Sequence, residues 1–394
     1  MTRKRIAAAG RPVLLLVGVL LIAANLRAPI TGVAPLLDAI RDAFSLGTAE
    51  AGILTTLPLL IFAGASPFCV LLAREYGLER SLFIALLLTA AGIIIRSWGE
   101  QWTLFLGTGV IGLGIAIANV LLPSLVKRDF SHRIAVLTST YALTAGVVAS
   151  LASVAAVPIA NLPGSGWNWA LGAFLVFPLV AMLAWIPQLK GHSAPAAATP
   201  TPPHGGKVWH SPLAWQVTFF FGLNSLVYYV VVTWLPVMLT EAGYSPAAAG
   251  SLHGVSQLAT AIPGLFLGAI VGRMKDQRAI AVGVAAVTAL SLIGLMLKPG
   301  WGILWSALFG VGAGATFILG LAFISLRAAN PRQAAALSAM AQSVGYLVAA
   351  GAPPAIGYLH DGSGSWTTPL LICTAVCVVM GLLGLGAGRA KQID

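Results

Sequence analysis

One arginine lies in the middle of an apolar segment near the start of the chain. Arg27 is close to the centre of the run at 12–36, where nearly all other residues are aliphatic or small. A charge at the centre of a membrane helix costs at least about 2.5 kcal/mol and is too deep to reach water. No Asp or Glu falls deep in another apolar run, so we expect Arg27 to bind an anion or a strong acceptor on a solute. The alternative is a structural arginine that joins two helices through a buried carboxylate.

Two neighbours of Arg27 are expected to shape its surroundings. Pro29 cannot donate to the carbonyl four residues earlier, that of Asn25, and should bend the helix there. A bent helix with a freed carbonyl and an amide side chain suits the wall of a solute cavity. We therefore predict that Asn25 and Arg27 take part in substrate binding.

Polar side chains recur at a spacing of four residues in three later apolar runs. This spacing places two side chains on one face of a helix. The pairs are Asn224 with Tyr228, His253 with Gln257, and Gln342 with Tyr346, and Tyr229 follows the first pair. Such pairs either join neighbouring helices or line a polar cavity, and three pairs near mid-membrane favour a substrate cavity shared with Arg27. Asn119, whose carbonyl is freed by Pro123, and Tyr141 are further substrate-binding candidates from the first half of the chain.

The sequence offers little support for catalysis or for a bound cofactor. It contains neither a G-x-x-x-x-G-K-[ST] phosphate loop nor an H-E-x-x-H metal motif. We therefore expect no metal, no cofactor, no catalytic residue and no ATP hydrolysis. His253 is the one histidine well inside an apolar run, where it either carries a proton near neutral pH or bridges two helices.

The segments that carry these residues are predicted to be membrane-spanning helices. The 394 residues are 58% apolar and only 8% charged, whereas a soluble protein has about 25% charged residues. The apolar runs reach the roughly 20 helical residues that cross a hydrocarbon core. We predict helices near 12–36, 49–72, 81–98, 102–126, 134–158, 168–187, 212–239, 246–271, 280–297, 301–326, 334–357 and 367–387.

Two halves are visible in the sequence. AEAGILTT at 49–56 is echoed by AAAGSLHG at 247–254, and the glycines at 112 and 114 by those at 312 and 314, which indicates a duplication. The segment 188–211 is rich in Pro, Gly, Ala and Thr and reads as a flexible linker. We predict an N-terminal six-helix bundle at 1–187, a cytoplasmic linker at 188–211 and a C-terminal six-helix bundle at 212–394. The fold class is then an all-α membrane protein of two pseudo-symmetric bundles.

The distribution of basic residues predicts the orientation of the chain. The net charge of +11 is spread between apolar runs rather than gathered in one polar domain, which argues for a lipid bilayer and against nucleic acid as the partner. With a cytoplasmic N-terminus, all but four of the 22 Lys and Arg lie on the inner side. The exceptions are Arg27 inside the first helix and Arg41, Arg96 and Lys298 on the outer side. Both termini are therefore expected in the cytoplasm.

Several stretches resemble the CynX/NimT family of the major facilitator superfamily. The resemblance is carried by NLRAPITGVAPLL at 25–37 and LTTLP at 54–58. Further stretches at 211–230, 250–265 and 334–347 are most similar to its 2-nitroimidazole transporter branch rather than to its cyanate-transporter branch. The resemblance implies a monomeric secondary active transporter of the bacterial inner membrane. It would move small nitrogen-containing or anionic solutes, such as 2-nitroimidazoles or cyanate, by alternating access.

The sequence also departs from the superfamily pattern. The loop at 74–80 keeps Gly77 but has Arg74 where the superfamily has Asp, which predicts a reversed or weaker charge pairing on the inner side. The direction of transport and proton coupling stay open, and a proton-coupled multidrug efflux carrier is one alternative. A non-transporting receptor or a channel is another, although a channel would not need duplicated halves. A membrane enzyme with His253 as general base would need a nucleophile or metal partner, and none is recognisable.

Overall fold

The computed structural model describes residues 2–130, 134–190, 206–329 and 331–393, and the regular structure in these ranges is helical. Eleven segments of these ranges are long and apolar enough to cross a membrane, so the predicted all-α membrane fold is confirmed. The predicted span at 334–357 corresponds to α16 (Pro331–Ser363), which contains Pro353 and Pro354 and is not among the eleven. Most of the predicted linker, 191–205, lies outside the described residues.

The chain forms two compact units. Unit 1 comprises Met1–Val33 and Gly64–Ala198, and unit 2 comprises Ala34–Ala63 and Thr199–Asp394. The first span therefore begins in unit 1 and ends in unit 2. The helix α4 (Thr48–Tyr76) begins in unit 2 and ends in unit 1. The division at 188–211 that the repeats suggest remains a prediction.

Unit 1 is built from the first helices and from those that follow α4. Its helices are α1 (Thr2–Ala24), α2 (Ala28–Thr31), α5 (Leu78–Arg96), α6 (Gln101–Asp129), α7 (Ile134–Ala160), α8 (Trp167–Ala173) and α9 (Val176–Trp185), with the short η3 (Ile186–Lys190). α5 packs along α6, and α1 packs against α7 and α9. Small residues allow this close approach: a Cβ on Gly107 of α6 would lie 2.3 Å from the backbone nitrogen of Arg96.

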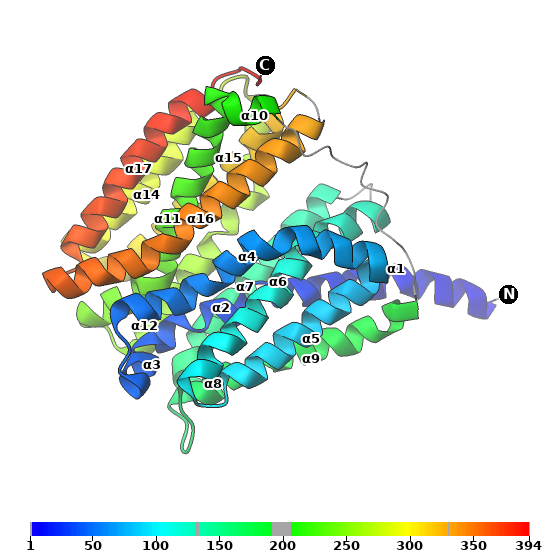
Figure 1. Ribbon diagram of the computed structural model, residues 1–394, viewed down its shortest axis with the longest axis horizontal. Coiled ribbons are helices and arrows are strands. Elements are labelled where there is room, and N and C mark those ends of the chain that lie inside the picture. Colours follow the sequence, from blue (N-terminus) through cyan, green and yellow to red (C-terminus); the bar gives the residue numbers. More distant parts are fainter. Residues whose placement is uncertain (1, 131–133, 191–205, 330, 394) are drawn as a thin grey trace. The chain divides into compact units, whose positions relative to one another are not determined.

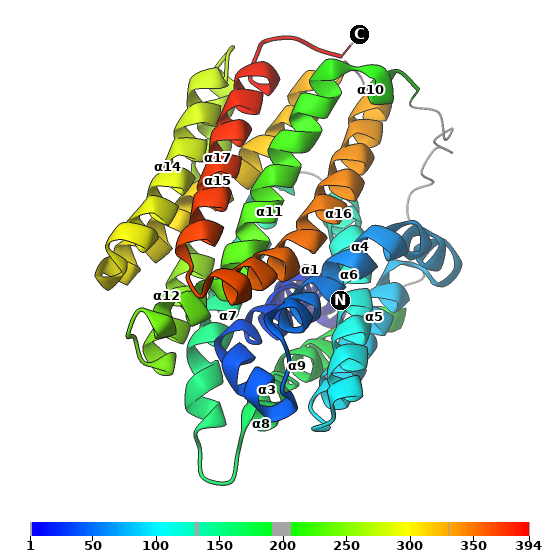
Figure 2. The same ribbon diagram turned by 60° about the vertical axis from the view of Figure 1, so that its left-hand side comes forward.

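Unit 2 is arranged around α11 (Pro212–Glu241), which packs against α12, α15, α16 and α17. The remaining elements are η1 (Ala34–Leu36), α3 (Leu37–Phe44), α10 (Gly206–His210), α12 (Pro246–Ala259), η4 (Ile262–Leu265), α13 (Leu267–Arg273), α14 (Arg278–Leu297), η5 (Pro299–Trp301), α15 (Gly302–Arg327), α16 and α17 (Thr367–Ala387). Figures 1 and 2 both show α11 beside α16 and α14 beside α17.

Three of the predicted continuous helices are interrupted. The run at 12–36 ends as α1 at Ala24 and resumes as α2 at Ala28, with a turn between them. The run at 246–271 is divided into α12, η4 and α13, and the run at 168–187 into α8 and α9. Proline explains the first two interruptions, because Pro29 and Pro263 lie in the first turns of α2 and η4, where a missing N–H costs nothing.

Charged contacts close the predicted inner ends of both units. The buried carboxylate of Glu79 pairs with Arg128 at 2.8 Å, whereas the side chain of Arg74 lies outside the described part. In unit 2, Arg327 donates to Gln277 and, at 2.7 Å, to the carbonyl of Ala387. In each unit, the end of one long helix (α6 or α15) is thus tied to the start of another, α5 through Glu79 or α14 through Gln277.

Candidate functional site

The turn between α1 and α2 positions Arg27. Arg27 precedes the first residue of α2, and its carbonyl accepts the backbone N–H groups of Ile30 and Thr31, both at 3.0 Å. Its side chain is partly buried. Arg27 also interacts with a neighbouring group of the protein, so it is not an unpaired cation.

Packing within unit 1 holds α2 in place. The Thr31 hydroxyl donates to the carbonyl of Ala149 on α7 at 3.3 Å. A Cβ on Gly32 would lie 2.2 Å from the ring of Phe174, so only glycine allows this contact. The backbone that carries Arg27 is therefore fixed from two sides.

Asn25 leaves one polar atom open in this turn. The residue is 3% exposed, and its side-chain nitrogen donates to the carbonyl of Leu21 at 2.8 Å. Its Oδ1 is buried and has no hydrogen-bond partner among the described residues. Because buried polar atoms are normally paired, this oxygen is suited to accept a donor from a ligand.

Arg96 is a residue of this region that sequence reasoning missed. It is fully buried at the end of α5, and its Nη1 donates to the carbonyl of Pro29 at 2.6 Å. Within the described residues it has no salt-bridge partner, and its Nε and Nη2 have no hydrogen-bond partner. In the sequence, Arg96 lies beside a polar turn, which favours a solvent-exposed side chain. No local pattern indicates its contact with Pro29.

Unit 2 joins two of the predicted polar pairs. The hydroxyl of Tyr228 on α11 donates to Gln257 Oε1 at 2.9 Å, and Gln257 Nε2 lies 3.2 Å from His253 Nε2. The imidazole also hydrogen bonds with the backbone of Val232. His253 and Gln257 are fully buried, whereas Tyr228 is partly exposed. We call Tyr228, Gln257 and His253 the relay.

The neighbours of Tyr228 on α11 differ in character. Asn224, one turn earlier, is 2% exposed, and its Oδ1 has no hydrogen-bond partner in the described part of the chain. Tyr229 packs edge to face on Tyr228, with ring centres 5.2 Å apart, and also contacts the core around Leu59 and Ala349. Asn224 thus offers an acceptor, while Tyr229 supports the ring of Tyr228.

The remaining predicted site residues make other contacts. Gln342 is exposed and donates to Ser338 Oγ at 2.8 Å, and Tyr346 packs edge to face on Phe221. In unit 1, Tyr141 is partly buried and hydrogen bonds with Thr138. Asn119 is exposed on α6, which contains Pro123.

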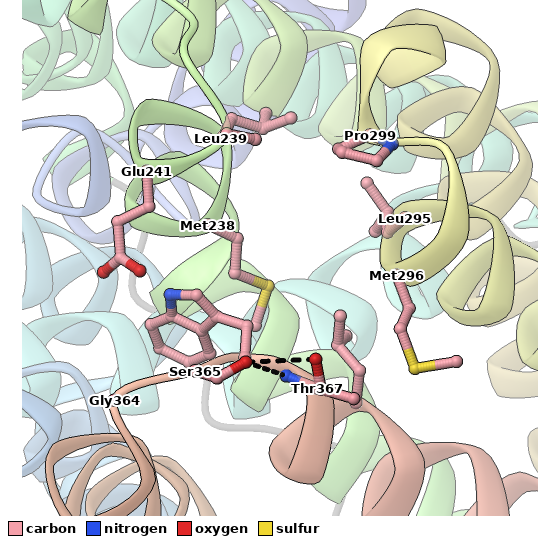
Figure 3. Close-up of a pocket in the computed structure, with 12 residues that line it drawn as sticks. Met238, Leu239, Glu241, Leu295, Met296, Pro299, Gly364, Ser365 and Thr367 are labelled. Carbon is pink, nitrogen blue, oxygen red and sulfur yellow. Dashed lines mark hydrogen bonds between the residues drawn. The ribbon is translucent and has the colours of Figure 1, made fainter.

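A pocket of about 230 Å³ lies elsewhere in unit 2, between the ends of α11, α14 and α17. Its wall is mixed, with Met238, Leu295 and Met296 as apolar lining residues and Glu241 and Thr367 as polar ones (Figure 3). None of the predicted site residues lines it.

The described residues contain no group of three or more His, Cys, Asp or Glu side chains that could hold a metal ion. The three cysteines are free and buried.

Comparisons with known proteins agree with this architecture. A model described as Major Facilitator Superfamily matches residues 15–353. The chain is 53% identical to the 2-nitroimidazole transporter of Escherichia coli (strain K12) over 381 residues, which is 97% of each chain. It is 29% identical to the cyanate transport protein CynX of the same organism, over 93% of this chain and 94% of that protein. The solved structure of a D-xylose-proton symporter is similar with a TM-score of 0.79 at 15% identity, covering 96% of this chain and 99% of the symporter.

Proposed function

This chain belongs to the Major Facilitator Superfamily and is a multi-pass membrane transporter, and from that premise we propose that it moves small nitrogen-containing or anionic solutes across the bacterial inner membrane. A nitroimidazole is the first candidate because the likeness to the 2-nitroimidazole transporter extends over nearly the whole chain. Cyanate is the second, on the more distant likeness to CynX.

In this proposal Arg27 is the substrate anchor. A guanidinium presents several N–H donors in a planar fork that fits the two oxygens of a nitro group or a carboxylate. The observation that carries the proposal is the position of Arg27 on the interrupted first span, at a turn fixed by Pro29 and Arg96. Asn25, with its open acceptor, adds a second polar contact from the same turn.

We propose that residues of unit 2 also bind the solute. Tyr228 and Asn224 offer polar atoms on α11, with Gln257 and His253 behind Tyr228. Asn119, Tyr141, Tyr229, Gln342 and Tyr346 remain proposed contributors. A proton-coupled cycle would use His253, the imidazole of the relay. We further propose alternating access by a monomer with both termini in the cytoplasm.

The first experiment measures thermal stabilisation of the purified protein by 2-nitroimidazole, cyanate and nitrate. A ligand at about 100 times its Kd stabilises the folded state by about 2.7 kcal/mol. We expect stabilisation of the wild type and of Arg80→Gln, an exposed arginine, and its loss in Arg27→Gln. Equal stabilisation of all three proteins would exclude Arg27 as the anchor. Stabilisation by none of the ligands would contradict the proposed solute class.

A further inference from the structure

The relay is a hydrogen-bonded series whose direction can be worked out. The nitrogen of a carboxamide can only donate, so His253 Nε2 must accept from Gln257 Nε2. The neutral imidazole then carries its proton on Nδ1, and the bond between the ring and the backbone of Val232 uses that proton. With its nitrogen turned to His253, Gln257 presents Oε1 to Tyr228.

This direction determines what Tyr228 can offer to a solute. Gln257 Oε1 only accepts, so the hydroxyl proton of Tyr228 is directed to it. His253 and Gln257 are fully buried, and the accessible end of the relay is the partly exposed Tyr228. Its oxygen therefore presents a lone pair and no proton.

A second acceptor lies one turn away on the same face of α11. Asn224 Oδ1 is buried and has no hydrogen-bond partner among the residues that the structure describes. Leaving such an atom unpaired is costly, so a bound group that donates to it is favoured. Asn224 and Tyr228 thus both favour a hydrogen-bond donor on the solute, for two independent reasons.

We infer that this face of α11 selects solutes that donate a hydrogen bond from a ring or amide N–H, and that the relay enforces the selection by making Tyr228 an acceptor. The inference rests on the proposed function and narrows its substrate class to azoles with a free N–H. Cyanate and nitrate ions carry no hydrogen and leave both acceptors unpaired. A site built to pair a polar group discriminates strongly against ligands that lack the matching group.

The test compares 2-nitroimidazole with 1-methyl-2-nitroimidazole, in which a methyl group replaces the donor hydrogen. Dissociation constants are measured for the purified full-length protein by calorimetry, at a pH below the pKa of the ring N–H. The wild type is expected to prefer the unmethylated ligand by roughly tenfold, the effect of about one lost hydrogen bond. Tyr228→Phe is expected to bind the unmethylated ligand more weakly and to reduce the preference.

Two further variants distinguish the relay from a general loss of stability. Gln257→Met removes the acceptor for the Tyr228 proton, so the hydroxyl can turn outward and the preference should shrink. Tyr244→Phe is the matched control, because its hydroxyl bonds to Pro299 and Gly302 at 3.1 Å, and it should keep the wild-type ratio.

The outcomes separate this inference from the function on which it rests. If the wild type binds both ligands equally well, the inferred selection for an N–H donor is wrong, but the proposed transport of nitroimidazoles is not contradicted. If neither ligand binds a protein that unfolds cooperatively, the proposed nitroimidazole substrate is wrong and the inference fails with it. The comparison of two ligands on the wild type decides the point even where a variant does not fold.

Discussion

Arg27 and Arg96 approach the same proline turn in unit 1 but meet different surroundings. Arg27 is partly buried and is proposed to bind solute, whereas Arg96 is fully buried and donates to the carbonyl of Pro29. Arg96 is therefore a positioning residue: it holds the backbone from which Arg27 extends. Burying a charge without a paired acid costs several kcal/mol.

Arg96→Met should separate stability from binding. Methionine keeps the length of the side chain and removes the buried charge, so we expect an unchanged or higher Tm. The same variant should weaken binding of 2-nitroimidazole, because the carbonyl of Pro29 loses its donor and the turn becomes less fixed. Thermal unfolding and the Kd of one preparation check both. A markedly lower Tm would mean that Arg96 has a folding role beyond its bond to Pro29.

At the scale of elements, glycine and proline decide how the spans pack and where they break. Pro29 and Pro263 begin new helical segments within spans that composition alone presents as continuous. Glycines allow the backbones of α5 and α6 to approach, since a Cβ on Gly92 or Gly107 would lie within 2.7 Å of the other helix. Small residues at membrane helix contacts serve this purpose generally.

Gly107→Ala should destabilise the protein. The added Cβ would lie 2.3 Å from the Arg96 backbone nitrogen and 2.5 Å from the Gly92 carbonyl oxygen, neither of which can move away easily. Overpacking of this kind typically costs about 1–3 kcal/mol. Gly283→Ala on α14 is the control, because its Cβ would meet nothing within 4 Å. Its Tm should be unchanged or slightly higher, since alanine is the better helix former. Equal Tm values for the two variants would contradict the tight contact.

At the scale of the whole molecule, the sequence echoes that predict a duplication do not coincide with the division of the chain by its contacts. The residues 34–63 pack in unit 2, where Thr55 and Thr233 join their hydroxyls at 2.9 Å. A Cβ on Gly52 would lie 2.6 Å from the backbone of Pro354, so α4 and α16 are in close contact there. Membership of a compact unit thus depends on long-range packing rather than on order along the chain.

The predicted orientation can be tested with two introduced cysteines. Thr201→Cys lies in the predicted cytoplasmic linker and Gly300→Cys in η5, on the predicted outer side. In intact cells a membrane-impermeant maleimide should label Gly300→Cys and leave Thr201→Cys unlabelled until the membrane is opened. The native cysteines are buried, so the background should be low. The reverse labelling pattern would overturn the orientation inferred from the basic residues.

The sequence alone was sufficient for features that depend on local chemistry. Apolar runs of membrane length predicted the spans, and the missing N–H of proline predicted a bend beside Arg27, although a full break was not foreseen. The spacing of four residues placed His253 and Gln257 on one helix face, where they do make contact. These inferences hold because a helix is determined by residues within a few positions of one another.

Only the tertiary structure decided which distant groups meet. Arg96 reaches Pro29 across 67 positions, and Tyr228 reaches Gln257 across 29. Gln342, predicted to share a face with Tyr346, donates to Ser338 one turn earlier on α16. Such partners depend on which helices pack together and on how each is rotated about its axis. A hydrogen bond between two spans produces no periodic pattern in the sequence of either span. Composition, spacing and motifs could therefore indicate candidate polar residues but not which of them bond to each other.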